Sequence, residues 1–284
     1  MQNAIYMNDS YIKEFKAVVE SVKDDKFVVL DKTAFYPSGG GQPHDTGVMI
    51  CNGEEYPVVY VGKFSGQISH EVAKSGLKSG DKVIGKINWD RRYKFMRMHT
   101  AAHLVSSIFH NKLGALITGN QIDEDKTRID FSMENFDRQK IIQYINQANE
   151  IIRQDSPVKI YFLPKEDAMK IPGVVKLAGA LPPDVSTLRI IEIPGVDLQA
   201  DGGTHVKSLA EIGTIEFVKA ENKGKDNARV IKQDALHFTI CAEQRRDLSA
   251  ERKPKEHHEQ RRPDCKQHSL ECRLCRVPFP SGSP

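Results

Sequence analysis

The sequence lacks the features that would direct a chain into or across a membrane. No apolar run approaches the about 20 residues that a membrane-spanning helix requires. The opening segment, MQNAIYMNDSYIKEF, has no basic stretch followed by an apolar one, so it does not resemble a secretory signal. We therefore expect a cytoplasmic protein with no membrane partner.

Cysteine and net charge are also scarce in the main part of the chain. Cys51 is the only cysteine among residues 1–240, which excludes an internal disulfide framework and suits a reducing compartment. Residues 1–240 hold 31 basic and 31 acidic side chains, whereas residues 241–284 hold ten basic and seven acidic ones. Bulk charge thus gives no indication of nucleic-acid binding, and an RNA contact would need a local basic patch.

What the sequence does contain is enough apolar material for globular cores. It has 284 residues, of which 39% are hydrophobic, a length that accommodates two domains. Short segments rich in β-branched residues, separated by turn clusters such as PSGGGQP and KSGD, predict strands at Phe15–Val22, Phe27–Leu30, Tyr56–Val61 and Lys82–Ile87. Strands at this spacing without intervening helices suggest a small barrel or a sandwich.

Beyond this region the pattern becomes mixed. Residues 91–113 contain no Gly or Pro and are followed by Gly114, which predicts a helix with a glycine C-cap. An apolar stripe predicts a second helix at 137–154, and it consists of Ile141, Ile145, Ala148 and Ile152. Further strands are predicted at Val158–Leu163, Leu188–Ile193 and Thr214–Val218. Helices on a mostly antiparallel sheet predict an α+β fold.

These patterns predict three regions. Residues 1–90 are expected to form a small N-terminal β-barrel domain, and residues 91–240 an α+β domain. Residues 241–284 contain Arg pairs and five prolines but no sustained apolar period, so we expect a disordered tail.

The strongest chemical signal is the sequence His99-Thr-Ala-Ala-His103 within the first predicted helix. A spacing of four places both imidazoles on one helix face, where they can bind one metal ion. The alternative is a pair of ordinary helix histidines. No Glu follows His99, so the HExxH metalloprotease pattern is absent.

A second signal is Asp201-Gly-Gly-Thr-His205, which follows a predicted strand. The two glycines permit a tight turn that could direct both polar side chains at one point. Taken alone, the segment is better explained as an ordinary glycine-rich turn with a surface histidine. Together with the histidine pair, it makes a four-ligand set with an open or exchangeable position, as a catalytic zinc needs.

A third signal is the segment from Thr33 to Gln42, TAFYPSGGGQ. Successive glycines allow a backbone to approach a ligand or another strand closely, and the two polar side chains could contact that ligand. A flexible hairpin connection is the alternative.

The three motifs, in the forms TAFYPSGGGQPHDTG, NWDRRYKFMRMHTAAHL and GVDLQADGGTHV, together resemble freestanding alanyl-tRNA editing proteins of the AlaX type. The resemblance covers roughly residues 5–235 and extends to the editing domain of alanyl-tRNA synthetase. The GGGQ segment within an N-terminal barrel is similar to the medium-length class. The resemblance implies that residues 91–240 form a zinc-binding editing (deacylase) domain.

The resemblance implies a role for individual residues. The metal ligands would be His99, His103 and His205, with Asp201 at a position where much of the family has Cys. A carboxylate can also bind zinc, although Asp201 could instead support a ligand. The resemblance also places Thr33 and Gln42 against the amino-acid moiety or the attacking water. It predicts tRNA contacts from the basic residues of the segment 222–229, namely Lys223, Lys225 and Arg229.

The implied activity is hydrolysis of the ester in misacylated alanine tRNA, seryl- and possibly glycyl-tRNA(Ala), with zinc as cofactor, tRNA as partner and no nucleotide cofactor. Two other functions remain open at this point. One is an inactive tRNA- or protein-binding module of the same fold, and the other is a zinc hydrolase for another small ester or amide.

Overall fold

The computed structural model of the protein describes residues 3–132, 137–172, 174, 185–222 and 236–243. These residues all belong to one compact unit, Met1–Arg245. None of the helices in the described ranges is long and apolar enough to cross a membrane. From position 244 onward, the predicted tail lies outside the described residues.

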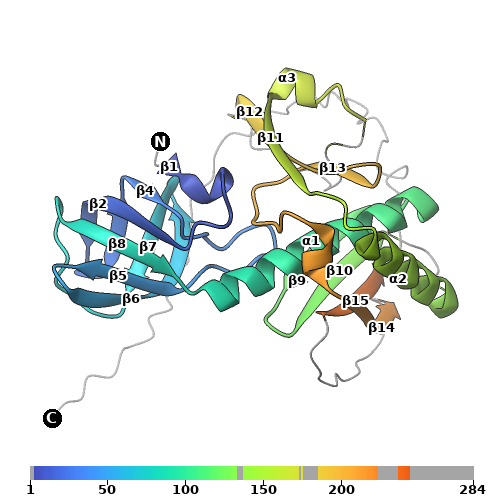
Figure 1. The fold of residues 1–284 in the computed structure, drawn as a ribbon, viewed down its shortest axis with the longest axis horizontal. Helices are drawn as coiled ribbons and strands as arrows, with labels where there is room; N and C mark the ends of the chain where they lie inside the picture. The colour runs from blue at the N-terminus through green and yellow to red at the C-terminus, as the bar shows by residue number, and fades with distance from the viewer. Residues whose placement is uncertain (1–2, 133–136, 173, 175–184, 223–235, 244–284) are drawn as a thin grey trace, which may run out of the picture. The chain divides into compact units, whose positions relative to one another are not determined.

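A closed six-stranded barrel forms the N-terminal part (Figure 1). Its strands follow the order β2 (Glu14–Lys23), β3 (Phe27–Leu30), β7 (Gln67–Val72), β6 (Glu54–Phe64), β5 (Gly47–Cys51) and β8 (Lys82–Ile87). All neighbouring pairs are antiparallel. Alternate residues of β2 point inward, as the period of a strand requires, and form part of the barrel core. The barrel, and not the sandwich, is therefore the N-terminal architecture.

The four strands predicted in this region are present, but two others were missed. Sequence analysis gave no strand for β5 or β7. In β7 the segment QISHEV looks polar, yet His70 is fully buried in the barrel. The His70 ring can be buried there because both of its nitrogens have hydrogen-bond partners, the Val28 carbonyl and the Thr33 hydroxyl. Three short elements complete this part. Strand β1 (Asn3–Ala4) pairs in parallel with β4 (Lys32–Thr33), and η1 (Ile5–Met7) is a 3-10 helix.

A long helix, α1 (Trp89–Leu113), leads out of the barrel. It begins two residues before the predicted start because the Asn88 side chain caps it, accepting a hydrogen bond from the Arg91 amide. Gly114 ends it in the left-handed conformation, as predicted. Most of α1 is buried, including polar side chains in its central turns. Buried polar groups need partners, and these partners define the functional site.

Two sheets and a second helix surround α1. One sheet has the order β14-β15-β10-β9, with β9 (Ile117–Ile122), β10 (Lys126–Ser132), β14 (Ile215–Asn222) and β15 (Leu236–Glu243). The other is antiparallel and contains β11 (Lys159–Pro164), β12 (Thr187–Ile193) and β13 (Asp197–Ala200). The short helices are α3 (Lys165–Ala168) and η2 (Leu209–Ile212).

Helix α2 (Arg138–Arg153) buries the predicted stripe against the core that it shares with α1. The arrangement is compatible with an α+β fold, but the predicted single antiparallel sheet is replaced by two sheets. In the first of them, β15 runs parallel to both of its neighbours. Strand β15 also continues to Glu243, beyond the predicted boundary at 240.

The barrel and α1 are joined by a fully buried ion pair between Asp45 and Arg92. Asp45 also accepts a hydrogen bond from the Tyr36 amide, and its own amide donates to the Tyr36 carbonyl at 3.0 Å. These bonds close the base of the loop that carries the GGGQ motif. The Arg92 guanidinium also donates to the carbonyls of Ser10 and Ala34. One side chain of α1 thus fixes the loop and the N-terminal segment together.

Replacing Asp45 by alanine should lower the free energy of unfolding by about 3–5 kcal/mol, because Arg92 would keep a buried charge without its partner. Denaturant titration measures this loss. Glu71→Ala is the control, since Glu71 pairs with Lys26, whose side chain is 48% exposed, and such pairs contribute at most about 1 kcal/mol. Equal losses in the two variants would contradict the proposed importance of the pair.

Candidate metal centre

Two pairs of side chains from distant parts of the sequence meet between α1 and the turn that follows β13. They are those of His99, His103, Asp201 and His205, and their ligand atoms all lie within 4.8 Å of one another. The three histidines are buried, and the Asp201 side chain is 16% exposed. The two spacings of four residues therefore converge on one point, as the sequence predicts.

The separations within this cluster suit a small cation. The Asp201 carboxylate lies 3.1 Å from Nε2 of His205, 3.7 Å from Nε2 of His99 and 4.0 Å from Nε2 of His103. A tetrahedral zinc with bonds of about 2.0–2.2 Å places its ligand atoms about 3.4 Å apart. The three separations, measured from Oδ2 for His205 and from Oδ1 for the other two histidines, bracket that spacing.

Each histidine is anchored through Nδ1. In His103 this nitrogen lies 3.0 Å from Asp197 Oδ2, and in His205 it lies 3.1 Å from Thr100 Oγ1. The Thr100 hydroxyl donates to the Met96 carbonyl, so it is available to accept from the His205 ring. With Nδ1 as the donor in each ring, Nε2 carries the lone pair and faces the cluster.

The third anchor comes from the barrel. Gln42 Oε1 lies 3.0 Å from Nδ1 of His99 and also accepts the Thr204 amide at 3.1 Å. Gln42 Nε2 donates to the Thr204 hydroxyl at 2.9 Å. One buried side chain of the GGGQ loop thus holds a histidine of α1 and the turn that carries Asp201. Gln42 therefore contacts His99 of the cluster, and its predicted contact with the amino-acid moiety or the attacking water stays a prediction.

Burial determines the protonation of the cluster. It lowers the pKa of His99 to about 4, and the pKa of His205 falls well below its ordinary value for the same reason. Burial alone would raise the pKa of Asp201, but the attraction of the three surrounding histidines outweighs it and holds that pKa well below the usual range. At neutral pH His99 and His205 are therefore neutral imidazoles and Asp201 is a carboxylate, which are the protonation states that bind a metal ion.

The turn itself leaves no room for a side chain at Gly203. A Cβ there would collide with the His99 ring and would lie 3.0 Å from Asp201 Oδ2. The Gly203 amide also donates to Asp201 Oδ2 at 2.5 Å. Gly202 is different, because a Cβ at that position would have no atom within 4 Å. Only the second glycine is thus required for the close approach of the turn to α1.

The other predicted site residues lie elsewhere. Thr33 is fully buried in the barrel, where its hydroxyl contacts Nε2 of His70 at 2.8 Å and accepts the Phe35 amide. Its predicted contact with a substrate stays a prediction. The predicted tRNA contacts Lys223, Lys225 and Arg229 lie outside the described residues.

Sequence analysis missed two supporting residues. Asp197 lies four residues before Asp201, and Thr100 follows directly after His99. Their nearness to the predicted ligands was a usable signal, because metal-binding histidines usually donate their second ring nitrogen to a carboxylate or a similar acceptor.

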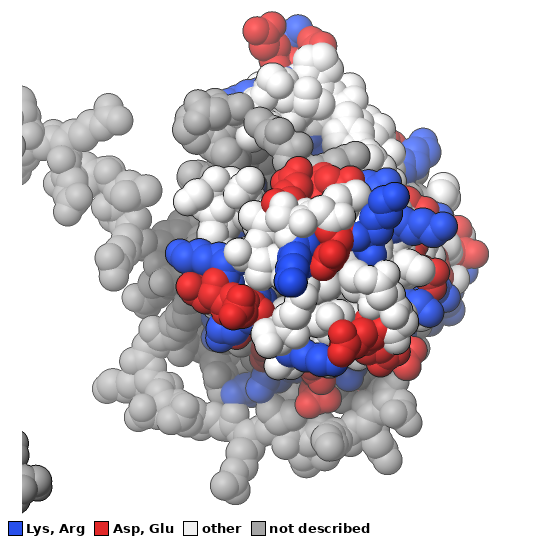
Figure 2. Space-filling view, turned by 90° about the vertical axis from the view of Figure 1, so that its left-hand side faces the viewer, with Lys and Arg blue, Asp and Glu red and all other residues white. Residues whose placement is uncertain are grey.

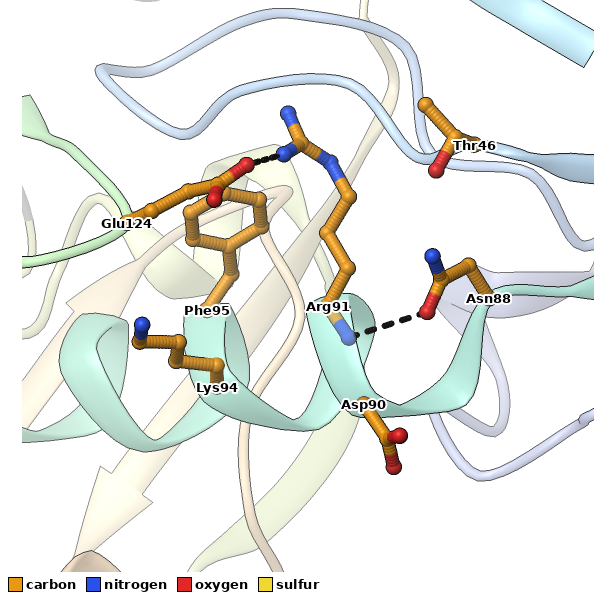
Figure 3. A pocket seen from close by; sticks show the side chains of 7 residues that line it. All are labelled: Thr46, Asn88, Asp90, Arg91, Lys94, Phe95 and Glu124. Carbon is orange, nitrogen blue, oxygen red and sulfur yellow. Dashed lines mark hydrogen bonds and ion pairs between the residues drawn. The ribbon is translucent and has the colours of Figure 1, made fainter.

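A pocket of about 510 Å³ lies at the N-terminal end of α1, apart from the cluster (Figure 3). It is lined by Thr46, Asn88, Asp90, Arg91, Lys94, Phe95 and Glu124. Arg91 forms an ion pair with Glu124, and the lining holds two cationic and two anionic side chains. On the face shown in Figure 2, the described basic and acidic side chains are likewise interspersed. The pocket thus carries no net charge that would identify a ligand.

Two family models match separate parts of the chain, and known proteins match most of its length. The family model "tRNA synthetases class II (A)" matches residues 3–91, and "Threonyl and Alanyl tRNA synthetase second additional domain" matches residues 188–231. The chain is 49% identical over 247 residues to "Alanyl-tRNA editing protein AlaX-M" of Methanosarcina barkeri, covering 84% of this chain and 99% of the relative. It is 50% identical over 233 residues to the Saccharolobus solfataricus protein of that name, covering 81% and 98%.

A larger protein also matches. The chain is 34% identical over 254 residues to "Alanine--tRNA ligase" of Pyrobaculum neutrophilum, which covers 87% of this chain but 28% of the ligase.

The two neighbouring glycines provide a sharp test of the cluster. Gly203→Ala should weaken zinc binding by about 10-fold or more, because the new methyl group displaces His99 from its position. Gly202→Ala should bind zinc as the unmodified protein does. Competition with a chromophoric chelator measures both affinities, and equal affinities would show that His99 does not take part in binding.

Proposed function

The chain belongs to the AlaX family of alanyl-tRNA editing proteins, and we propose that it hydrolyses the ester of misacylated alanine tRNA at a zinc site. The observation that carries this proposal is the convergence of three Nε2 atoms and one carboxylate. Each imidazole has a hydrogen-bond partner at its other ring nitrogen, Nδ1. Zinc bound by such a set polarises a carbonyl oxygen and lowers the pKa of a bound water to about 7.

The protein's own residues would hold and orient the reacting groups. His99, His103 and His205 provide the neutral nitrogen ligands, and Asp201 provides the single negative charge that partly compensates a divalent ion. Gln42 keeps one amide hydrogen beyond the one that it donates to Thr204, and we assign this hydrogen to the substrate or to the attacking water. Thr33 is proposed to contact the amino-acid moiety through a rearrangement of its bond with His70.

We propose seryl-tRNA(Ala), and also glycyl-tRNA(Ala), as the substrates. A hydrogen bond to the serine hydroxyl favours serine over alanine, and a polar pocket that excludes the alanine methyl group rejects alanine further, whereas glycine has no methyl group to exclude. Lys223, Lys225 and Arg229 are proposed to contact the tRNA backbone. Residues 1–90 would then contribute Gln42 and Thr33 to the site, while residues 91–240 form the editing domain.

The activity should appear as release of serine from seryl-tRNA(Ala) well beyond one equivalent per protein, with much slower release of alanine from alanyl-tRNA(Ala). His103→Ala should lose most of its zinc and should lower the rate by about 100-fold or more, because a ligand is removed. His110→Ala is the matched control, since His110 lies on the same helix outside the cluster. Binding without turnover would instead identify an inactive tRNA-binding module.

The role of Asp201 can be tested separately. If it binds zinc directly, Asp201→Ala should weaken zinc binding strongly, whereas Asp201→Cys should retain or tighten it, because a thiolate is a softer ligand. Zinc titration monitored by calorimetry measures these affinities. An unchanged affinity in the alanine variant would assign Asp201 to a supporting position and would leave three histidines as the ligands.

A further inference from the structure

We propose that Arg189 of β12 is a positioning residue that holds the Asp201–His205 turn in its metal-binding conformation. This inference rests on the proposal that the cluster binds a metal ion. The hydrogen bonds of the Arg189 side chain go to backbone carbonyls and not to the cluster side chains, although its charge contributes, besides burial, to the lowered pKa of His99. Arg189 acts through the backbone of the turn, which carries two of the four ligand side chains.

The contacts of Arg189 are unusually specific for this task. Its Nη1 atom donates to the carbonyls of Asp201 and Gly203, at 3.0 and 2.8 Å. The Asp201 amide donates to the Arg189 carbonyl at 3.1 Å. Main chain and side chain of one residue thus hold both ends of the tightest part of the turn. The Gly203 carbonyl is fixed at the position where the His99 ring packs on the backbone.

The same guanidinium also reaches the N-terminal segment. Its Nε donates to the Met7 carbonyl at 2.7 Å. A neighbouring contact joins the same two parts, because the His205 amide lies 3.4 Å from Ser10 Oγ. The turn is therefore held between β12 and residues 7–10. The Arg189 side chain, which comes from β12, forms hydrogen bonds with both the turn and residue Met7.

Stability alone does not explain an arginine here. Arg189 is only 4% exposed, and its strand neighbours Leu188, Ile190 and Ile191 are buried apolar residues. Burying a guanidinium costs free energy, and its Nη2 has no hydrogen-bond partner among the described residues. Such local violations in an otherwise consistent core are expected at functional sites. The three carbonyls that Arg189 binds are the compensation that the structure shows.

The direction of these bonds also matters for the metal. Arg189 donates to backbone carbonyl oxygens, while the oxygens of the Asp201 carboxylate face the histidines. The guanidinium thus orients the ligand without occupying its lone pairs. Lysine would retain the charge but would lose the planar fork that reaches several carbonyls at once.

The test compares Arg189→Lys and Arg189→Met with the same substitutions at Arg97. Arg97 is the matched control, because it also donates through two nitrogens to a backbone carbonyl, that of Ile212, at 3.2 and 2.8 Å. Zinc affinity is measured by chelator competition, and the melting temperature is measured with zinc and with a chelator. Both Arg189 variants should bind zinc about 10- to 100-fold more weakly, as is usual when the support of a metal ligand is removed.

The control defines the contrary result. The Arg97 variants should lower the melting temperature in chelator while leaving zinc affinity within about twofold of the original. If the Arg189 variants behave in the same way, Arg189 only stabilises the fold and the inference is wrong. If Arg189→Met does not fold, Arg189→Lys decides, since it keeps the charge and most of the volume. Absence of zinc binding in the unmodified protein would instead overturn the metal proposal itself.

Discussion

The metal cluster depends on one constraint, which is that each imidazole must present Nε2 to the same point. A neutral imidazole has one donor and one acceptor nitrogen, so an acceptor fixed at Nδ1 determines the direction of the lone pair. The fold supplies three such acceptors, a carboxylate on β13, a hydroxyl on α1 and an amide oxygen from the barrel loop. All three are buried, so water does not compete for the rings. The rest of the structure can be understood as the means of placing these acceptors.

The barrel takes part in the site through this constraint. Gln42 reaches His99 because its loop is closed at the base by Asp45 and fixed to α1 by Arg92. Gly41, at φ +83°, allows the loop to lie against β9, where a Cβ would collide with Asn120 and where the Gly41 carbonyl accepts the Ile122 amide. The glycines of both motifs thus allow close contacts. Gly41 lies against Asn120 of β9, and Gly203 lies against His99 of α1. A change in the barrel loop would therefore alter a ligand of the neighbouring helix.

Sequence analysis singled out the four side chains that meet in the cluster because two spacings of four residues are local patterns. Helix α1 and its glycine cap were predictable for the same reason. The nearness of Asp197 and Thr100 to the predicted ligands marks them as candidates, but the histidine that each one contacts depends on how α1, β13 and the following turn pack together. The parallel pairing of β15 with β10 was also unpredictable, since it joins residues that are about a hundred positions apart. Sequence analysis assigned no role to Arg189 of β12, because its function depends on bonds to two carbonyls of a separate turn.

The composition of the donor set explains why the supporting bonds carry so much weight. Three imidazoles and one carboxylate provide a single negative charge and no thiolate, so the ligand atoms alone offer less to zinc than a cysteine-containing set. In the proposed zinc site, affinity would then depend on preorganisation, because the rings are already oriented by folding. A buried Asp197, a buried Gln42 and a clamped turn perform this task. Because each support lies on a different element, folding of the whole unit around α1 is what creates the site.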